Sequence, residues 1–207
     1  MKDDQKNCHL KDLKDNIRAL QQKIGLYEDM KAYEALYMLL SPRLNNFCFS
    51  LVKSNEAAEE IVSDVFIKLW QIKDKLTDIQ NLKVYLYTIA KNFCLNYITR
   101  QSRNAVVRLD EMDIEPMVQL GNPEDLCISA DAVQQIRRCI KELPPQCRII
   151  FQLVKEDGMS YAETAAVLNI SILTVRNQVF IATRKIGALI PASIQSAVLF
   201  SGRRSAS

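Results

Sequence analysis

Polar and basic side chains recur at helical spacing near the carboxyl end of the chain, together with one aromatic ring. The set is Thr174, Arg176, Asn177, Phe180, Arg184 and Lys185. At this spacing the side chains share the polar face of one helix. Guanidinium, ammonium and amide groups are donors that suit the base edges and phosphates of duplex DNA. The alternative is an ordinary helical hairpin with a solvated charged face.

The segment that precedes this helix has the features of a helix-turn-helix. Ser160 and Glu163 predict a capping box, with Met159 as the apolar staple. Asn169 falls at the turn, where Asn tolerates a left-handed backbone, and Ser171 is the predicted cap of the second helix. We expect that helix to bury Ile172, Val175, Val179, Ala182 and Ile186. The motif predicts a protein that binds the major groove of duplex DNA.

A second set of polar side chains lies on a predicted helix from about residue 82 to residue 101. The basic members are Lys83, Lys91, Arg100 and Arg103, and the amide and aromatic members are Asn92, Asn96, Tyr85, Tyr87, Phe93 and Tyr97. Basic groups follow phosphates, while amides and aromatic rings suit unstacked bases. The alternative places the aromatic rings in the core and the charges in solvent. We expect Phe93 and Ile89 to be core residues, and we favour Lys91, Asn92, Asn96 and Arg100 as contacts with single-stranded DNA.

The composition favours helices as the elements that position these groups. Only 5 Gly and 6 Pro occur in 207 residues, 48% of the residues are hydrophobic and 25% are charged. Helical patterns extend over about 29–53, where Pro42 should kink or interrupt the helix, and from Asn55 as the predicted cap of the next helix. A polar connector, about 71–80, precedes the helix of residues 82–101. The net charge of +3 is compatible with nucleic-acid binding.

An acidic segment, 105–130, divides the pattern into two domains. It carries Asp and Glu with helix-breaking Pro and Gly, which is typical of a domain linker. A helix of about 130–143 follows, and then a helix that should begin near Pro145 and reach about Asp157, with Gly158 as its C-terminal cap. We therefore predict an all-α protein with domains at 29–104 and 131–188. The N-terminal extension, 1–28, and the C-terminal tail, 189–207, are unassigned.

The sequence contains no pattern that indicates an enzyme, a metal site or a cofactor. It has one histidine, His9, no Cys-x-x-Cys pair, no phosphate-binding Gly loop and no nucleophile paired with a base. The six cysteines are Cys8, Cys48, Cys94, Cys127, Cys139 and Cys147. Four of them fall on helical patterns and should be reduced and apolar in character, which favours the cytoplasm. No signal peptide and no apolar run of membrane-spanning length is present, so we expect no membrane insertion.

Two sequence blocks resemble bacterial RNA polymerase sigma factors. Residues 59–70 read EEIVSDVFIKLW and residues 82–97 read LKVYLYTIAKNFCLNY, which resemble region two. Residues 143–151 read LPPQCRIIF and, with the helix-turn-helix, resemble region four. The blocks occur in family order, and the flanking domains of housekeeping sigma factors are missing. The chain thus resembles the extracytoplasmic-function (ECF) subfamily over about 29–186.

The resemblance implies two polymerase contacts. In the family the helix of the first block docks on the coiled coil of the β′ subunit, at positions that match Glu60, Ser63, Asp64 and Lys68. Ser63 replaces the usual Gln there. Trp70 matches an aromatic of the family, although we favour a role for it in the domain core. The flap of the β subunit is a candidate partner of region four, and Phe180 would either contact it or touch a thymine methyl.

The resemblance also implies two promoter contacts. The connector residues Leu76, Thr77 and Asp78 match the loop that captures a flipped base of the −10 element, and Asn92 matches the amide that helps to read it. In the −35 element, Arg176 would bond a guanine edge, and Arg184 and Lys185 would bind phosphate. Members of the family are often held inactive by an anti-sigma factor, which makes such a protein a candidate partner. The competing hypothesis is a helix-turn-helix regulator that binds duplex DNA without polymerase.

Overall fold

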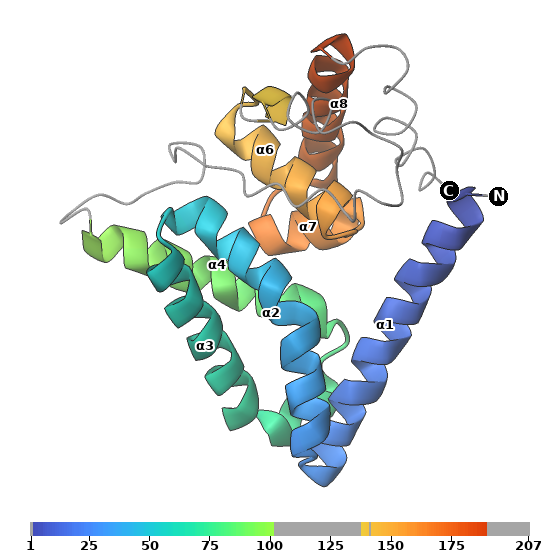
Figure 1. Ribbon diagram of the computed structural model, residues 1–207, viewed down its shortest axis with the longest axis vertical. Helices are drawn as coiled ribbons and strands as arrows, with labels where there is room; N and C mark the ends of the chain where they lie inside the picture. Colours follow the sequence, from blue (N-terminus) through green and yellow to red (C-terminus); the bar gives the residue numbers. More distant parts are fainter. Residues whose placement is uncertain (1, 102–137, 141, 190–207) are drawn as a thin grey trace. The chain divides into compact units, whose positions relative to one another are not determined.

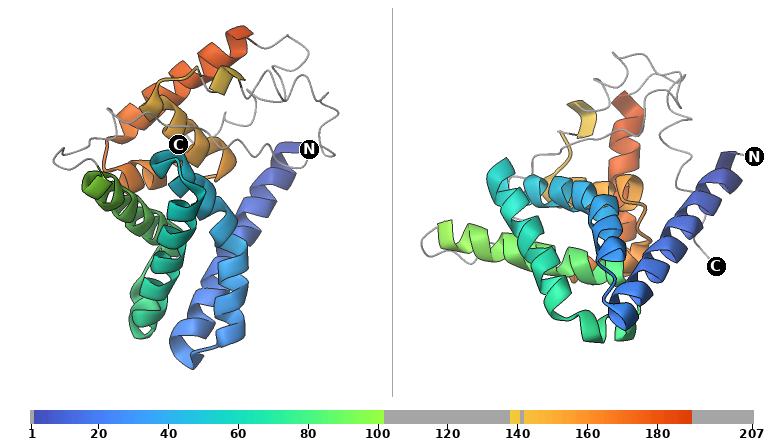
Figure 2. Two further views of the ribbon diagram at one scale, coloured as in Figure 1. Left: turned by 60° about the vertical axis from the view of Figure 1, so that its left-hand side comes forward. Right: turned by 60° about the horizontal axis from the view of Figure 1, so that its bottom comes forward.

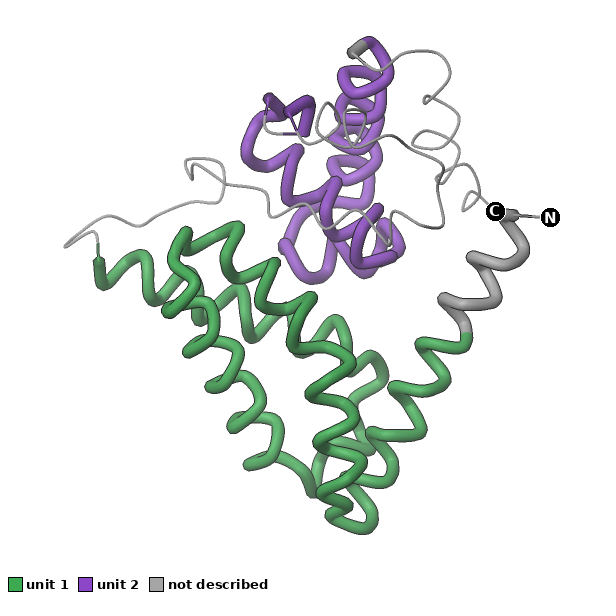
Figure 3. Tube along the Cα trace, viewed as in Figure 1, with its two compact units in different colours: residues 1–105 green, residues 106–207 purple. Residues whose placement is uncertain are grey.

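The computed structural model describes residues 2–101, 138–140 and 142–189, and every regular element there is helical. The predicted all-α fold class is confirmed. The chain divides into two compact units, Met1–Ala105 and Val106–Ser207 (Figure 3). The first is called unit 1 below and the second unit 2. The finer domain limits given above stay predictions.

Unit 1 is built around the second of its helices (Figure 1). Its elements are α1 (Lys2–Tyr27), α2 (Met30–Val52), α3 (Asn55–Gln71), the 3-10 helix η1 (Lys73–Asp78) and α4 (Leu82–Gln101). Helix α2 packs against α1, α3 and α4, and α3 also packs against α4. In the core, the rings of Phe47 from α2 and Tyr87 from α4 lie 5.1 Å apart. Such aromatic pairs add to the free energy gained by burying apolar surface.

Helix α2 continues through Pro42 without a break in its helical residues. The ribbon bends part-way along α2 in both Figure 1 and Figure 2. Proline removes one backbone donor and its ring pushes against the preceding turn, which bends a helix. Of the two outcomes expected for Pro42, the kink is the one observed. The ends of α2 are capped by the Asp29 carboxylate, which accepts from two backbone amides, and by Lys53 at φ 58°.

The cap of α3 corrects the sequence prediction by one residue. Ser54, not Asn55, is the N-cap, because its backbone is extended and its Oγ accepts from the amide of Ala57 at 3.2 Å. Ser54 Oγ also donates to Glu56 at 2.8 Å. Ser and Asn are both good caps, so the sequence alone could not choose between adjacent candidates.

The connector of residues 71–80 was expected to be a polar loop and contains a 3-10 helix instead. Residues 73–78 form η1, and Leu76 anchors it through a fully buried side chain. A single apolar residue gives no periodicity, so the sequence pattern does not predict this helix. The following helix, α4, has the predicted limits, and Asn81 Oδ1 accepts from the amide of Val84 at its start.

The described part of unit 2 contains three short helical segments and one long helix. They are α6 (Pro145–Phe151), the π-helix η4 (Gln152–Glu156) and α7 (Tyr161–Leu168), followed by α8 (Ile172–Leu189), which contacts α6 and α7. Pro145 starts α6 as predicted, and Gly158 has the left-handed φ of 65° expected of a cap. The final turn before Gly158 is π rather than α. Most of the helix expected at 130–143 lies outside the described residues.

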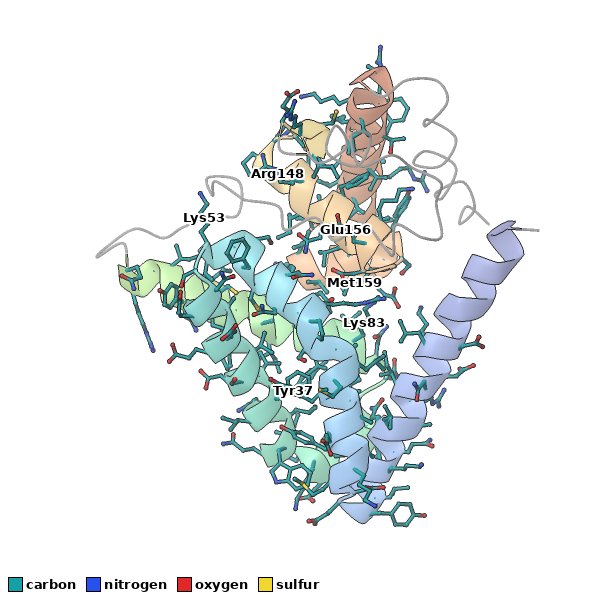
Figure 4. All side chains as sticks on the ribbon, in the orientation of Figure 1. Tyr37, Lys53, Lys83, Arg148, Glu156 and Met159 are labelled. Atoms are coloured by element: carbon teal, nitrogen blue, oxygen red, sulfur yellow. The ribbon has the colours of Figure 1, made fainter. Side chains whose placement is uncertain are left out.

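A buried arginine joins the start of unit 2 to α6. Arg148 of α6 (Figure 4) donates from Nε to the carbonyl of Ile140 at 3.1 Å and from a terminal nitrogen to that of Leu143 at 2.8 Å. These carbonyls belong to the chain just before the Pro144–Pro145 break. The surrounding core consists of Cys139, Ile140, Leu143, Cys147, Phe151, Ala182 and Ile186. Because charge-assisted hydrogen bonds are strong, one side chain secures the approach to the helix-turn-helix.

Candidate nucleic-acid and polymerase interface

The helix-turn-helix has the local geometry that its residues predict. The capping box is complete: Ser160 Oγ accepts from the Glu163 amide, and the Glu163 carboxylate accepts from the Ser160 amide at 2.7 Å. Asn169 has φ 58° and ψ 48°, the left-handed conformation expected at the turn. Ser171 Oγ accepts from the amide of Thr174 at 3.0 Å and caps α8. The angle between the two helices is thus set by local hydrogen bonds.

Helix α8 buries one stripe and exposes the other face. Val175, Val179, Ala182 and Ile186 are buried as predicted. Ile172 is the exception, because it is the first residue of α8 and is 50% exposed. The helical periodicity correctly located the stripe but overran the end of the helix, where no neighbouring element covers the side chain.

The exposed face of α8 carries the candidates for the −35 contact. Arg176, Asn177, Arg184 and Lys185 are exposed, and Phe180 is 65% exposed. Thr174 is half-buried, and its hydroxyl lies 2.8 Å from Ser171 Oγ. Donors and one exposed ring therefore occupy the side of α8 that no described part of unit 2 covers. This arrangement fits a helix that inserts into a groove, where donors must be free of protein packing.

In η1 the three candidate residues separate into one core residue and two surface residues. Leu76 is fully buried, which corrects the expectation that its side chain contacts a base. Thr77 and Asp78 are exposed at the end of η1. The connector can therefore present a hydroxyl and a carboxylate to a base, while Leu76 holds it on the protein.

In α4 the amide pair is exposed and one of the expected basic contacts is buried. Asn92, Asn96 and Arg100 are exposed, with the two amides one turn apart. Lys91 is only 8% exposed, and burial lowers the pKa of its ammonium group. Burial disfavours the charged form, so Lys91 is a poor candidate for a phosphate contact in this conformation. Arg103 lies outside the described residues.

The aromatic residues of α4 lie deeper than a stacking surface requires. Tyr87 is fully buried, whereas Tyr85, Phe93 and Tyr97 are half-buried. Lys83 is buried as well, with its Nζ 6.0 Å from the centre of the Tyr87 ring. Tyr87 fits the core alternative for these rings: it is a core residue and not a ring on which a base can stack.

The candidate polymerase-binding residues form one face of α3. Glu60, Ser63, Asp64 and Lys68 are all exposed and recur at helical spacing. Ser63 Oγ donates to the Glu59 carbonyl one turn earlier at 2.9 Å. Among these polar groups Ile67 is 54% exposed, an apolar residue that the sequence analysis did not single out. A mixed charged and apolar helix face is typical of a protein-binding surface.

Behind this face an aromatic cluster ties α3 to α2. Tyr33 donates from its hydroxyl to the Phe66 carbonyl at 2.9 Å and packs edge-on against Trp70 at 5.1 Å. Tyr37 packs on Phe66 at 4.7 Å, between the two helices (Figure 4). Trp70 is half-buried and contributes to this packing, as expected of a core aromatic.

Comparisons with known proteins agree with this arrangement. The profile of sigma-70 region 2 matches residues 36–104, and that of sigma-70 region 4 matches residues 133–186. The chain is 28% identical over 159 residues to the ECF RNA polymerase sigma-E factor of Escherichia coli K12, covering 73% of this chain and 83% of that protein. The chain belongs to the ECF sigma factors. The sigma factor SigW of Bacillus subtilis is 22% identical over 158 residues, covering 73% of this ECF sigma factor and 84% of SigW.

Two solved structures share the fold of this ECF sigma factor, each with a TM-score of 0.55. One is CnrH in complex with the cytosolic domain of CnrY, 19% identical, covering 84% of this chain and 96% of that chain. The other is RpoE in complex with the anti-sigma factor NepR from Bartonella quintana, 24% identical, covering 77% of this chain and 97% of that chain.

The family is a regulatory one, whose members bind RNA polymerase and direct initiation at specific promoters. Within the described residues, no group of three or more His, Cys, Asp and Glu side chains is placed to hold a metal ion. No single described helix is long and apolar enough to cross a membrane, and α7 with Ile172–Ala188 passes that test only as a pair bent by 109°.

Proposed function

We propose that three exposed faces of this ECF sigma factor divide the work of promoter recognition. The α3 face of Glu60, Ser63, Asp64 and Lys68 binds the coiled coil of the polymerase β′ subunit. The end of η1 and the exposed amides of α4 capture and hold the melted −10 strand. The exposed face of α8 reads the −35 element. The observation that carries this proposal is the exposure of polar groups on all three faces, each on the side away from the core.

The roles within the −10 site follow from exposure. Thr77 and Asp78 lie at the surface of η1, and Asn92 and Asn96 lie on the exposed side of α4. A carboxylate accepts from base amino groups, and an amide both donates and accepts, so these residues can read the edge of an unstacked base. Arg100 supplies a phosphate contact further along α4.

The roles within the −35 site follow from donor geometry. Arg176 presents a guanidinium group that can bond two acceptors of one guanine. Arg184 and Lys185 lie further along α8 and bind phosphate, which adds affinity without sequence preference. Phe180 contributes an exposed ring to the same helix, suited either to a thymine methyl or to the β flap.

An anti-sigma factor is the second proposed partner. Of the two solved structures of the same fold, one is CnrH in complex with the cytosolic domain of CnrY, and the other is the sigma factor RpoE in complex with the anti-sigma factor NepR. A regulator that covers the α3 face would compete directly with core polymerase. Because core RNA polymerase is the proposed binding partner, we expect the protein to act in the cytoplasm.

Reconstituted initiation tests the assignment of the two DNA sites. Purified protein added to core RNA polymerase should direct specific transcripts from promoter-containing genomic DNA. Arg176→Ala should lower discrimination between the preferred and altered −35 sequence about tenfold, because one bidentate base contact is lost. Asn92→Ala should leave that discrimination intact and slow open-complex formation, measured with permanganate footprinting.

Matched controls separate these effects from loss of folding. Arg138→Ala removes an exposed arginine of unit 2 outside α8, and Gln22→Ala removes an exposed amide of α1. Both should initiate like the unaltered protein. Loss of core binding by Arg176→Ala and Asn92→Ala alike would show that the DNA sites are misassigned. The absence of any specific transcript would contradict the proposed function.

A further inference from the structure

The amide of Gln21 joins α1 to the 3-10 helix η1. Its Nε2 donates to the carbonyl oxygens of Leu76 at 2.5 Å and Ile79 at 2.7 Å. Gln21 is buried, with 5% of its surface exposed. The two carbonyls lie on either side of Thr77 and Asp78, whose side chains are exposed. One buried amide therefore fixes the backbone at both ends of the dipeptide.

Two further contacts hold η1 against α1. A Cβ added to Gly25 would lie 3.0 Å from Thr77 Cγ2 and 3.3 Å from the Lys73 carbonyl oxygen, so the helix and η1 approach as closely as glycine allows. Near the start of η1, Lys73 forms an ion pair with Glu28, just after the end of α1. The contact thus extends along the whole of η1.

The segment that makes these contacts lies before the region of the family match, which begins at residue 36. It would otherwise count as an N-terminal extension without a role. Yet a six-residue 3-10 helix has poor hydrogen-bond geometry and little stability of its own. Its conformation must come from what it packs on, and here that support is largely α1.

We propose that Gln21 is a positioning residue for −10 recognition, with α1 as the support that holds Thr77 and Asp78 ready to meet a flipped base. This inference rests on the proposed function of η1. Capturing a base in a preformed pocket requires no ordering of the protein at the moment of contact. Without the Gln21 amide the dipeptide would have to be ordered by the base itself, and the preference for one base over another would fall.

A near-isosteric substitution tests the role of the amide. Gln21→Met keeps the length and burial of the side chain but removes both hydrogen bonds. Initiation by the holoenzyme would be measured on a promoter found with the unaltered protein, with each −10 base of the non-template strand replaced in turn. We expect the preference for the captured base to drop about fivefold, the equivalent of one net hydrogen bond. Core binding and −35 discrimination should be unchanged.

A second variant changes the contact between α1 and η1 without altering Gln21 itself. Gly25→Ala introduces a Cβ against Thr77, and Ala is also the better helix former, so α1 itself is not weakened. The same selective loss of base preference is expected. Gln22→Met is the matched control, because it makes the same chemical change at the neighbouring exposed position.

The outcomes distinguish this inference from the proposed function. If the unaltered holoenzyme shows no dependence on any −10 base, the proposed function of η1 fails and the inference with it. If that dependence is present and Gln21→Met and Gly25→Ala both retain it, the positioning role alone is overturned. A loss of core binding equal to the loss of base preference would also overturn it, since a general stabilising role predicts that result.

Discussion

Burial sorts the candidate contact residues at the scale of single side chains. Leu76 and Lys91 lie in the helices expected to contact DNA, but their side chains are buried. Thr77, Asp78 and Asn92 are exposed. A sequence pattern identifies which helix carries a site more readily than which of its side chains reach solvent. The reason is that a half-buried helix can be rotated by one residue without changing its periodicity.

The burial of Lys91 should lower the pH at which its side chain titrates. Because desolvation lowers the pKa of Lys91 in the folded protein, the unfolded chain binds more protons between the folded and unfolded pKa values. The free energy of unfolding should therefore rise with pH across that interval. NMR of ¹³C-methylated lysines should show one resonance that titrates at lower pH than an ordinary lysine, and Lys91→Met should remove it.

The same substitution checks the stability side of that prediction. Lys91→Met removes the titrating ammonium group, so the free energy of unfolding should lose its rise with pH across that interval. Urea denaturation at a series of pH values measures this slope. An unchanged slope would mean that another group causes it.

At the scale of elements, caps and turns decide where each helix begins. The capping box at Ser160, the left-handed Asn169 and the Pro145 start were all predicted and are confirmed. These signals act over three or four residues, so they can be recognised without knowledge of the fold. The 3-10 helix η1 was missed, because its conformation depends on packing against α1, which is distant in the sequence. The π turn of η4 was missed as well.

The cap of α3 offers a direct test of that distinction. Ser54→Ala should lower the free energy of unfolding of unit 1 by about 1 kcal/mol, because the Ala57 amide loses its acceptor. Asn55→Ala should change it by much less, since Asn55 is exposed inside the first turn and Ala is the better helix former. Urea denaturation monitored by the fluorescence of Trp70 in unit 1 gives both values. Equal losses would show that the cap is shared.

At the scale of the whole molecule, the chain divides into two compact units. The all-α class, the helix-turn-helix and most of the helix limits could be predicted from the sequence, because they follow from periodicity and local signals. The support of η1 by α1 could not, since Gln21 and Leu76 are 55 residues apart and a lone buried amide has no sequence signature.

Because the α3 face lies in unit 1, we predict that the main polymerase contact belongs to unit 1. A fragment of residues 1–105 should compete with the full chain for core RNA polymerase, yet direct no −35-dependent initiation. Its own cooperative unfolding by circular dichroism should be measured first. Asp64→Lys in this fragment should abolish competition through charge reversal on the α3 face.

Asp15→Lys provides the control, because it makes the same charge change at an exposed position of α1. It should leave competition intact. A fragment that folds but fails to compete would place the main polymerase contact in unit 2 instead.

The buried thiols of each unit can report how often that unit opens. Cys48 and Cys94 lie in unit 1, and Cys139 and Cys147 lie in unit 2, all four free and buried. Desolvation contributes to raising the pKa of Cys139 and Cys147, and the hydrogen bond to Cys94 raises that of Cys48. An alkylating reagent reacts with thiolates, so these sulfurs are labelled only when their unit opens. The rate at which each sulfur is alkylated therefore measures how often its unit opens.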